Sequence, residues 1–414
     1  MKPKTIMLIA GEASGDVLAA ELVKALRTEI PEAEKDSTGY QQPWRTSLEP
    51  RFFCAGGPRL AEAGAELVLD LTAHSVVGLS DVIKNLAKYR RFFQQLKNLA
   101  IEREPDAIIC VDFSGFNLRL AGAIRCYIAS LKGTFGNWNP LMVQYISPQV
   151  WASRAGRARK MERWLDLVLS IFPFEKKWYA EHVPNLRVEY IGHPLVERYA
   201  NWPAPCPGGE LKSPPTVLLL PGSRPGELHR HLAVMAEAVR QIGRKLSFEN
   251  KVVLPNAELA GIAKKYLANY PELVVQVSGL PNALCQADLA LACTGTITME
   301  CARFGVPTVT LYKTSWSTYE IGKRLVQVPY LTMPNILAGK PVYPEFIQHE
   351  ATVENLAGAG LELLTNKARR VEIKTELRKI IESLGPPGAC RRAAQVIARM
   401  LAEKRSYRLR ATLG

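Results

Sequence analysis

TIMLIAGEASGDVLAAELVKALRTEI, residues 5–30, has the pattern of one α/β unit. Its first six residues form a continuous apolar run, which is typical of a strand buried on both faces. The small and polar residues 11–16 predict a turn, and apolar residues then recur at helical spacing. Strand, loop and helix in this order build a parallel sheet covered by helices, so we expect an α/β fold.

The same pattern recurs along the chain and divides it into two halves. The proline-rich stretch 192–215 has no helical or alternating pattern and is predicted to be a linker. We therefore expect two Rossmann-like domains that face a ligand-binding cleft, residues 1–196 and 197–385. The helix predicted within 386–414 should pack back on the first domain or on a partner subunit, and the polar residues 31–50 should form a surface insertion. The strand-like runs are FFCAG, DAIICVDF, LMVQYIS, LDLVLSIF and VEYIG in the first half, and TVLLL, KVVLPNA, LVVQVSG, ADLALAC and PTVTLY in the second.

The charge balance narrows the class of partner. Lys and Arg number 53 against 39 Asp and Glu, a formal net charge of +14 at pH 7. This excess favours a nucleic acid, a membrane surface or a phosphorylated substrate. The basic residues belong to no nucleic-acid recognition motif, so we expect no nucleic-acid partner. The eight cysteines are scattered singly, which argues against a zinc site and fits a reducing cytoplasm.

The strongest functional signal is TGTITMECARFGVP, residues 294–307, which lies between two strand-like runs. Thr294, Gly295 and Thr296 stand where a helix begins, and a helix N-terminus that contains a glycine favours a bound phosphate. Glu300 follows about one turn later, within reach of sugar hydroxyls beside that phosphate. A plain strand–turn–helix with a surface glutamate is the alternative interpretation.

A second loop, PGSRPGE (221–227), follows the strand-like run TVLLL. Gly222 and Ser223 form its turn. The planar guanidinium of Arg224 suits bidentate contact with a diphosphate. The alternative is a turn with a solvated arginine.

The loop GEASGD (11–16) follows the first strand. Gly11 and Gly15 bring the backbone close to a ligand, and Ser14 can cap the helix. Glu12 and Asp16 would repel a phosphate, so a role toward sugar hydroxyls or a base suits them better. A capped turn without a binding role remains open.

Eight short motifs occur in the order found in the lipid A disaccharide synthase family, which the chain resembles. The resemblance implies the two-domain GT-B glycosyltransferase fold and transfer of a diacylglucosamine unit from UDP to diacylglucosamine 1-phosphate. The anomeric centre inverts, and the product is a β-1,6-linked disaccharide. The motifs are GEASGD (11–16), AGGPR (55–59), SPQVWA (147–152), PFEK (173–176), IGHP (191–194), LPGSRPGE (220–227), MECARFGVP (299–307) and MPNILAG (333–339).

The resemblance also assigns roles to residues. It implies that Arg224 is essential, that Glu300 holds the ribose of UDP, and that Asn335 is functional. Family members form homodimers that exchange C-terminal segments, which implies a homodimer. No acidic pair lies in a metal-binding context, so we expect a reaction without metal or cofactor.

The sequence departs from the family at the general base. An inverting transfer needs a base near the acceptor hydroxyl. The family has an aspartate just before Phe-Asn in the segment VDFSGFN (111–117), where this chain has Gly115. Asp112 is the first candidate to replace it, and Glu12 and Asp16 are the others. A UDP-sugar 2-epimerase, another GT-B transferase and a non-catalytic lipid-binding homologue are the rival functions.

Two basic segments suggest contact with an anionic membrane. Apolar residues between 82 and 101 form a helical stripe flanked by lysines and arginines, which fits either a membrane surface or a core-packed helix. A second cluster, in residues 154–163, suits a membrane or the acceptor phosphate. No apolar run reaches the roughly 18 residues of a spanning helix. We therefore expect a cytoplasmic protein, peripheral on the inner face of the membrane.

Overall fold

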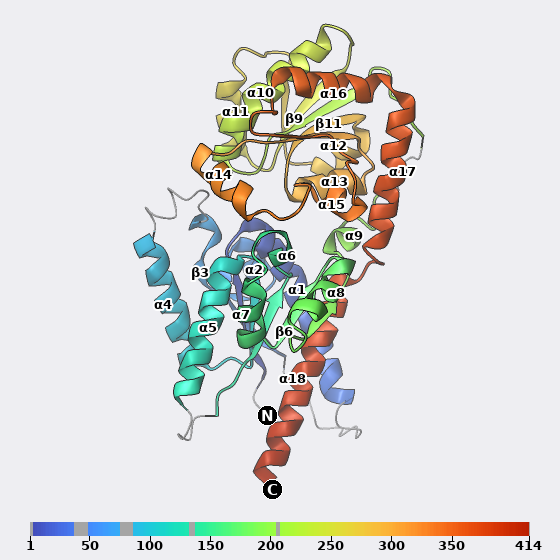
Figure 1. Ribbon diagram of the computed structural model, residues 1–414. Coiled ribbons are helices and arrows are strands. Elements are labelled where there is room, and N and C mark those ends of the chain that lie inside the picture. Colours follow the sequence, from blue (N-terminus) through green and yellow to red (C-terminus); the bar gives the residue numbers. More distant parts are fainter. Residues whose placement is uncertain (1–2, 37–48, 75–85, 132–136, 204–207, 414) are drawn as a thin grey trace. The chain divides into compact units, whose positions relative to one another are not determined.

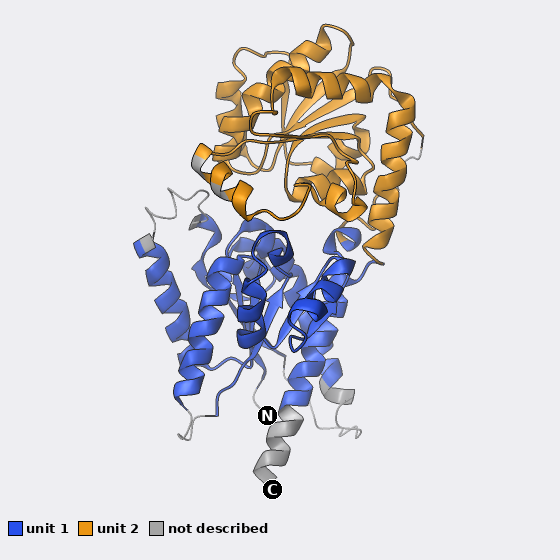
Figure 2. Cartoon of the chain, viewed as in Figure 1, with its two compact units in different colours: residues 1–197, 386–414 blue, residues 198–385 orange. Residues whose placement is uncertain are grey.

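The computed structural model describes residues 3–36, 49–74, 86–131, 137–203 and 208–413, and the chain forms two compact units (Figures 1 and 2). Unit 1 comprises Met1–Glu197 and Pro386–Gly414, and unit 2 comprises Arg198–Gly385. The chain therefore leaves unit 1, builds unit 2 and returns to unit 1 with its last helix.

Within the described residues, unit 1 has a sheet of seven strands in the order β3-β2-β1-β4-β5-β6-β7. All neighbours pair in parallel. The order reverses between β1 and β4, and ligands of such sheets bind at this reversal, beyond the carboxyl ends of the strands. The strands are β1 (Thr5–Ala10), β2 (Arg51–Gly56), β3 (Glu66–Asp70), β4 (Ala107–Val111), β5 (Leu141–Tyr145), β6 (Leu167–Ser170) and β7 (Val188–Tyr190).

The first and last helices of the chain lie side by side in unit 1. The C-terminal α18 packs along α1, and its Ala393, Ile397 and Leu401 are buried. The helices are α1 (Ala13–Asp36), α2 (Pro58–Glu62), the 3₁₀ turn η1 (Thr72–His74), α4 (Leu86–Arg103), α5 (Ser114–Ser130), α6 (Val150–Ser153), α7 (Arg157–Trp164), α8 (Pro173–His182), α9 (Pro194–Arg198) and α18 (Ala389–Leu413).

Unit 2 repeats the plan with six described parallel strands in the order β10-β9-β8-β11-β12-β13, which reverses between β8 and β11. These are β8 (Thr216–Leu220), β9 (Glu249–Leu254), β10 (Val274–Val277), β11 (Leu289–Cys293), β12 (Thr308–Tyr312) and β13 (Glu345–Ile347). The helices are α10 (Pro225–Gly243), α11 (Ala257–Tyr266), α12 (Leu280–Gln286), α13 (Thr296–Arg303), α14 (Trp316–Leu325), α15 (Met333–Ala338), α16 (Val353–Thr365) and α17 (Lys367–Ser383).

Three segments differ from the expectation drawn from the sequence. The surface insertion was expected from residue 31, but α1 continues through Pro31 to Asp36, and residues 37–48 lie outside the described part. The edge strands β3 and β13 were missed, because neither is a fully buried apolar run.

The described part of the apolar stripe expected between 82 and 101 lies in α4, which begins at Leu86; residues 82–85 lie outside the described part. Leu96 and Ala100 are buried, and Phe92, Phe93 and Leu99 pack against the hydrophobic core of unit 1. The rings of Phe93 and Phe116 meet edge to face, with centroids 5.8 Å apart. These contacts favour the core-packed interpretation of the stripe.

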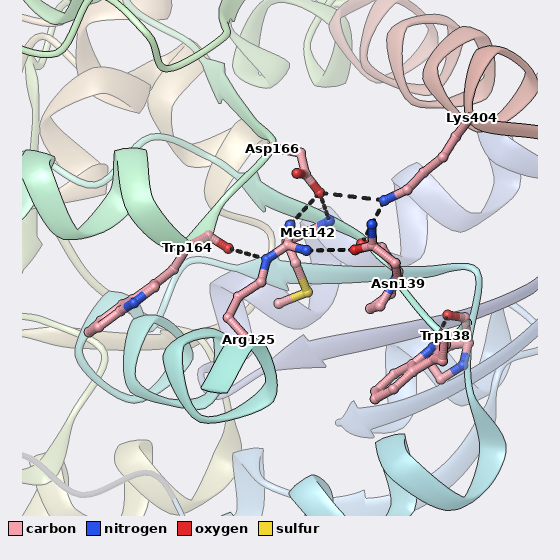
Figure 3. A network of polar contacts seen from close by, with 9 residues as sticks. Arg125, Trp138, Asn139, Met142, Trp164, Asp166 and Lys404 are labelled. Atoms are coloured by element: carbon pink, nitrogen blue, oxygen red, sulfur yellow. Dashed lines mark hydrogen bonds and ion pairs between the residues drawn. The ribbon is translucent and has the colours of Figure 1, made fainter. Parts of the chain in front are cut away.

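A network of polar contacts links α5 to the end of α7 (Figure 3). Arg125 of α5 forms an ion pair with Asp166 at 2.6 Å and donates to the carbonyl of Trp164 at 3.2 Å. Asp166 also accepts from the amide of Met142 at 2.8 Å. Lys404 of α18 donates to the carbonyl of Pro140 at 3.0 Å. The network thus joins α5, the end of α7, the start of β5 and α18.

Candidate functional site

The loops selected from the sequence lie at the two reversal points. In unit 1, residues 11–16 follow β1 and Asp112 follows β4, and these strands are neighbours. In unit 2, the loop 221–224 follows β8 and the loop 294–296 follows β11, also neighbours. Each unit therefore presents a candidate site where its fold class binds ligands.

Asp112 has a strained backbone at the end of β4. Asp112 and Phe113 both adopt left-handed conformations, with φ of 47° and 40°. Such strain costs about 1–3 kcal/mol per residue and clusters at functional sites. The carbonyl of Asp112 accepts from Asn117 at 3.0 Å and from Gln144 at 3.3 Å, which holds the turn in place. The Asp112 residue itself is exposed.

Of the two glycines that follow β1, Gly11 makes room for the Asp112 turn and Gly15 does not need to. A Cβ on Gly11 would lie 2.4 Å from the ring of Phe113, whereas a Cβ on Gly15 would lie 3.7 Å from the Cβ of Asp112, an ordinary contact. Helix α1 begins at Ala13, so Ser14 lies inside the first turn and not at the cap expected for it. Glu12 is half-buried beside these residues.

Asp16 is buried and engaged with the backbone. Its carboxylate accepts from the amides of Gly57 and Arg59, both at 2.9 Å, and of Leu60 at 3.2 Å. It thus satisfies the free amides at the start of α2. This geometry favours a role in positioning the AGGPR loop over a role as base.

In unit 2, the loop after β8 is built around Glu227. Gly222 has φ +132° and leaves no room for a side chain, since a Cβ would lie 2.3 Å from the Glu227 carboxylate. That carboxylate accepts from the Ser223 amide at 2.8 Å and lies 3.5 Å from the Arg224 guanidinium. Arg224 stands at the N-cap of α10 with its side chain partly exposed.

The loop after β11 exposes the start of α13. Gly295 is its N-cap and has φ +140°, and a Cβ added to it would meet no atom within 4 Å. Gly295 and Thr296 are exposed, and Thr294 is partly exposed. The hydroxyl of Thr298 donates to the Gly295 carbonyl at 2.7 Å, which holds the loop. The free amides of this helix start are open to an anion.

Glu300 lies one turn further along α13. Its Oε2 is buried and has no hydrogen-bond partner among the described residues. Burial raises the pKa of its carboxyl, while a hydrogen bond from Tyr199 and the charge of Arg198 act in the opposite direction. A buried acceptor without a partner is costly, and a ligand hydroxyl would satisfy it.

Asn335 of α15 is fully buried. Its amide group donates to the carbonyl of Tyr343 at 2.8 Å and to Glu345 at 2.7 Å, and its oxygen accepts from the Tyr343 amide at 2.8 Å. These bonds favour a role in holding α15 against the segment that leads into β13 over direct contact with a ligand.

The whole chain matches one family model and many curated relatives. The model of lipid-A-disaccharide synthetase matches residues 6–400. The chain is 35% identical over 407 residues to the lipid-A-disaccharide synthase of Solibacter usitatus, covering 96% of this chain and 97% of the relative. It is 32% identical over 408 residues to that of Myxococcus xanthus, covering 96% and 98%. The chain belongs to the lipid-A-disaccharide synthetase family.

Membership of the lipid-A-disaccharide synthetase family makes the chain a glycosyltransferase of lipid A biosynthesis, with a UDP-sugar donor and a sugar acceptor. The resemblance drawn from the eight motifs is thereby confirmed. No helix among the described residues has both the length and the apolar composition that crossing a membrane requires.

Solved structures of low identity share the fold. A putative UDP-N-acetylglucosamine 2-epimerase from Listeria monocytogenes matches with a TM-score of 0.57 at 17% identity, covering 90% of this chain and 91% of that one. The glycotransferase of kitacinnamycin matches with a TM-score of 0.54 at 19% identity, covering 96% and 99%. The expected α/β class with two parallel sheets is confirmed.

His231 and Glu227 hold the loops of unit 2, and neither role was predicted from the sequence. His231 is buried in α10, with Nδ1 2.8 Å from the Pro221 carbonyl, and its Nε2 accepts from the Lys313 amide at 3.1 Å. Burial lowers its pKa, and a neutral imidazole satisfies both contacts. Glu227 had a readable signal, because a glutamate three residues after an N-cap often accepts from the loop before a helix.

Proposed function

We propose that this chain transfers 2,3-diacylglucosamine from UDP to 2,3-diacylglucosamine 1-phosphate, forming the β-1,6-linked disaccharide 1-phosphate and UDP. The observation that carries the proposal is the open start of α13 beside the unpartnered Glu300 oxygen. An anion-binding helix start and a buried acceptor one turn away suit a diphosphate followed by a sugar hydroxyl.

The donor roles follow from the loops of unit 2. The backbone at Thr294, Gly295 and Thr296 binds the diphosphate, and Glu300 accepts from the ribose of UDP. Gly222 and Ser223 form the turn that presents Arg224. The guanidinium neutralises the charge that develops on the diphosphate as the glycosidic bond to UDP breaks. Asn335 acts indirectly, by holding α15 against Tyr343 and Glu345.

The acceptor roles belong to unit 1. Asp112 takes the proton of the acceptor hydroxyl, whose oxygen attacks the anomeric carbon while UDP leaves from the opposite face. The strained and clamped turn supports this choice over Glu12 and Asp16. Gly11 leaves room for the Phe113 ring of that turn, and Gly15 lies beside Asp112 in the first turn of α1. No metal or cofactor enters the proposed reaction.

The acylated substrates place the enzyme at a membrane. We propose peripheral binding to the anionic inner face of the cytoplasmic membrane, supported by the net charge of +14. A homodimer is part of the same proposal.

The decisive test is a transfer assay with synthetic donor and acceptor, followed by the appearance of disaccharide 1-phosphate. Radiolabelled donor incubated alone provides the control: an epimerised UDP-sugar without acceptor would identify a 2-epimerase instead. No product with any pair of acylated glucosamines would support the non-catalytic, lipid-binding alternative.

Two variants test the donor site. Arg224→Ala should lower kcat by about 10²- to 10³-fold, as does loss of one charge-stabilising donor. Glu300→Ala should weaken UDP binding in calorimetry and leave acceptor KM unchanged. Near-normal turnover of folded Arg224→Ala, or unchanged UDP binding by Glu300→Ala, would refute the respective role.

A further inference from the structure

Three arginines of unit 1 gather where helices α5 and α7 pack together. The helices are in close contact, since a Cβ on Gly122 of α5 would lie 2.9 Å from the ring of Trp164 of α7. Arg119 lies one turn before Gly122, and Arg157 begins α7. Arg154 lies in the turn just before α7, where its carbonyl accepts from the Arg157 amide at 2.9 Å.

These three side chains have no acidic partner in the part of the chain that the structure describes. Burial, followed by the charges of Arg154 and Arg119, lowers the pKa of the Arg157 guanidinium, and no carboxylate offsets these effects. Arg125, which lies on α5 with Arg119, differs from these three because it forms a 2.6 Å ion pair with Asp166 (Figure 3). Arg119 and Arg154 are exposed and Arg157 is half-buried. Water therefore screens part of the repulsion between these like charges, and an anion bound among them would remove the rest.

The arginine cluster lies at the functional edge of the sheet. Asp112 follows β4, and the loop that leads to Arg154 follows the neighbouring β5. Gln144 of β5 joins the two loops, since it donates to the carbonyls of Asp112 at 3.3 Å and of Ile146 at 3.1 Å. Neighbouring strands lie about 4.8 Å apart, so one small ligand can reach both loops.

We propose that Arg119, Arg154 and Arg157 bind the phosphate monoester of the acceptor. Guanidinium groups form bidentate hydrogen bonds with phosphate oxygens, and the start of α7 adds its dipole. With its phosphate on this cluster, the acceptor sugar lies toward Asp112. The inference rests on the proposed function and adds to it the group that selects a phosphorylated acceptor.

The test compares two acceptors on the full-length enzyme: 2,3-diacylglucosamine 1-phosphate and its methyl glycoside, which lacks the phosphate. Arg157→Gln should raise the KM of the phosphorylated acceptor roughly tenfold to a hundredfold, the value of one or two charged hydrogen bonds. The KM of the methyl glycoside and of the donor should stay unchanged. Arg157→Lys, which keeps the charge, should recover part of the loss.

Arg163→Gln is the matched control, because it removes the same charge from an exposed position on α7. Equal effects of Arg157→Gln and Arg163→Gln, or equal effects on both acceptors, would overturn the proposal. Sedimentation with phosphatidylglycerol vesicles tests whether the cluster binds the phosphate of a membrane lipid instead of the acceptor phosphate. If Arg157→Gln loses vesicle binding and treats both acceptors like the wild type, the cluster binds membrane lipid and the proposal is wrong.

Failure of the proposed function would be visible separately, as absence of transfer by the wild type. Calorimetry with glucosamine 1-phosphate and glucosamine then still tests the cluster. Binding of the phosphorylated sugar alone, lost in Arg157→Gln and kept in Arg163→Gln, supports the site. No preference for the phosphate by the wild type excludes it.

Discussion

Asp112 and Gly115 lie three residues apart and differ in what the fold demands of them. Asp112 adopts a left-handed backbone without being a glycine. Gly115 is exposed in the first turn of α5, and a Cβ there would meet no atom within 4 Å. Packing therefore does not require the glycine at the position where the family has an aspartate.

Asp112→Asn should abolish most turnover, because it keeps the size and hydrogen bonding of the side chain and removes its basic charge. General-base catalysis contributes about 10²- to 10⁴-fold, so kcat should fall within that range while UDP affinity in calorimetry stays unchanged. Gly115→Asp should fold normally and preserve or raise kcat. Full activity of Asp112→Asn would pass the role of base to Glu12 or Asp16.

Gly11 and Gly15 form a matched pair of glycines. Gly11→Ala drives a methyl group into the ring of Phe113 and should lower the free energy of unfolding by about 1–3 kcal/mol, a typical cost of overpacking. Gly15→Ala meets only ordinary contacts and lies in α1, where alanine is favoured by up to about 1 kcal/mol. Urea unfolding measures both, and equal destabilisation would contradict the assigned contact.

Among the elements, predictability follows the apolar run in the sequence, and even the exposed edge strand β10 was predicted from LVVQVSG. The central strands were predicted from apolar runs, and the loops that follow β1, β4, β8 and β11 were predicted as functional from glycine and capping patterns. The partly exposed β3 and β13 lack such runs. The contacts of Asp16 with Gly57 and of Asn335 with Tyr343 could not be predicted, because they depend on tertiary placement rather than on local spacing.

Helix α8 carries a buried carboxyl group, that of Glu175, which contacts Trp151 of α6. Glu175 accepts from Trp151 at 3.1 Å and from the amides of Ile171 and Phe172 at 3.2 and 3.1 Å. Burial outweighs these bonds and raises its pKa to about 7. The folded state therefore holds the proton more tightly than the unfolded state does.

The stability of the wild type relative to Glu175→Gln should fall as pH rises from about 4.5 to about 7 and then stay level. Below this pH range the Glu175 carboxyl is protonated in both the folded and the unfolded state. Above it the carboxyl is ionised in both states, and the free-energy cost of burying the charge is fully present. The full change is on the order of 3 kcal/mol, at about 1.4 kcal/mol per pKa unit. Urea unfolding at several pH values measures it, with the exposed Glu181→Gln as control. Parallel curves for the wild type and Glu175→Gln would contradict the raised pKa.

At the scale of the whole molecule, the last helix completes the first unit. Ile397 of α18 is fully buried, whereas Arg399 is exposed. Ile397→Ala should cost about 2–5 kcal/mol, and Arg399→Ala should stay within about 0.5 kcal/mol. Tryptophan fluorescence follows the unfolding mainly of unit 1, which holds five of the seven tryptophans, at positions 44, 138, 151, 164 and 178. An unchanged transition for Ile397→Ala would show that α18 does not stabilise unit 1.

Because unit 1 is built from two separate stretches of the chain, it also limits the order in which the nascent chain can fold. The segment Pro386–Gly414 is synthesised after unit 2, so the side of α1 that α18 covers stays uncovered while the whole of unit 2 is synthesised. Unit 2 is continuous in sequence and has all its residues before unit 1 does. The half of the enzyme whose translation begins first therefore receives its last helix only after the other half has been synthesised. Until then its exposed apolar surface favours aggregation.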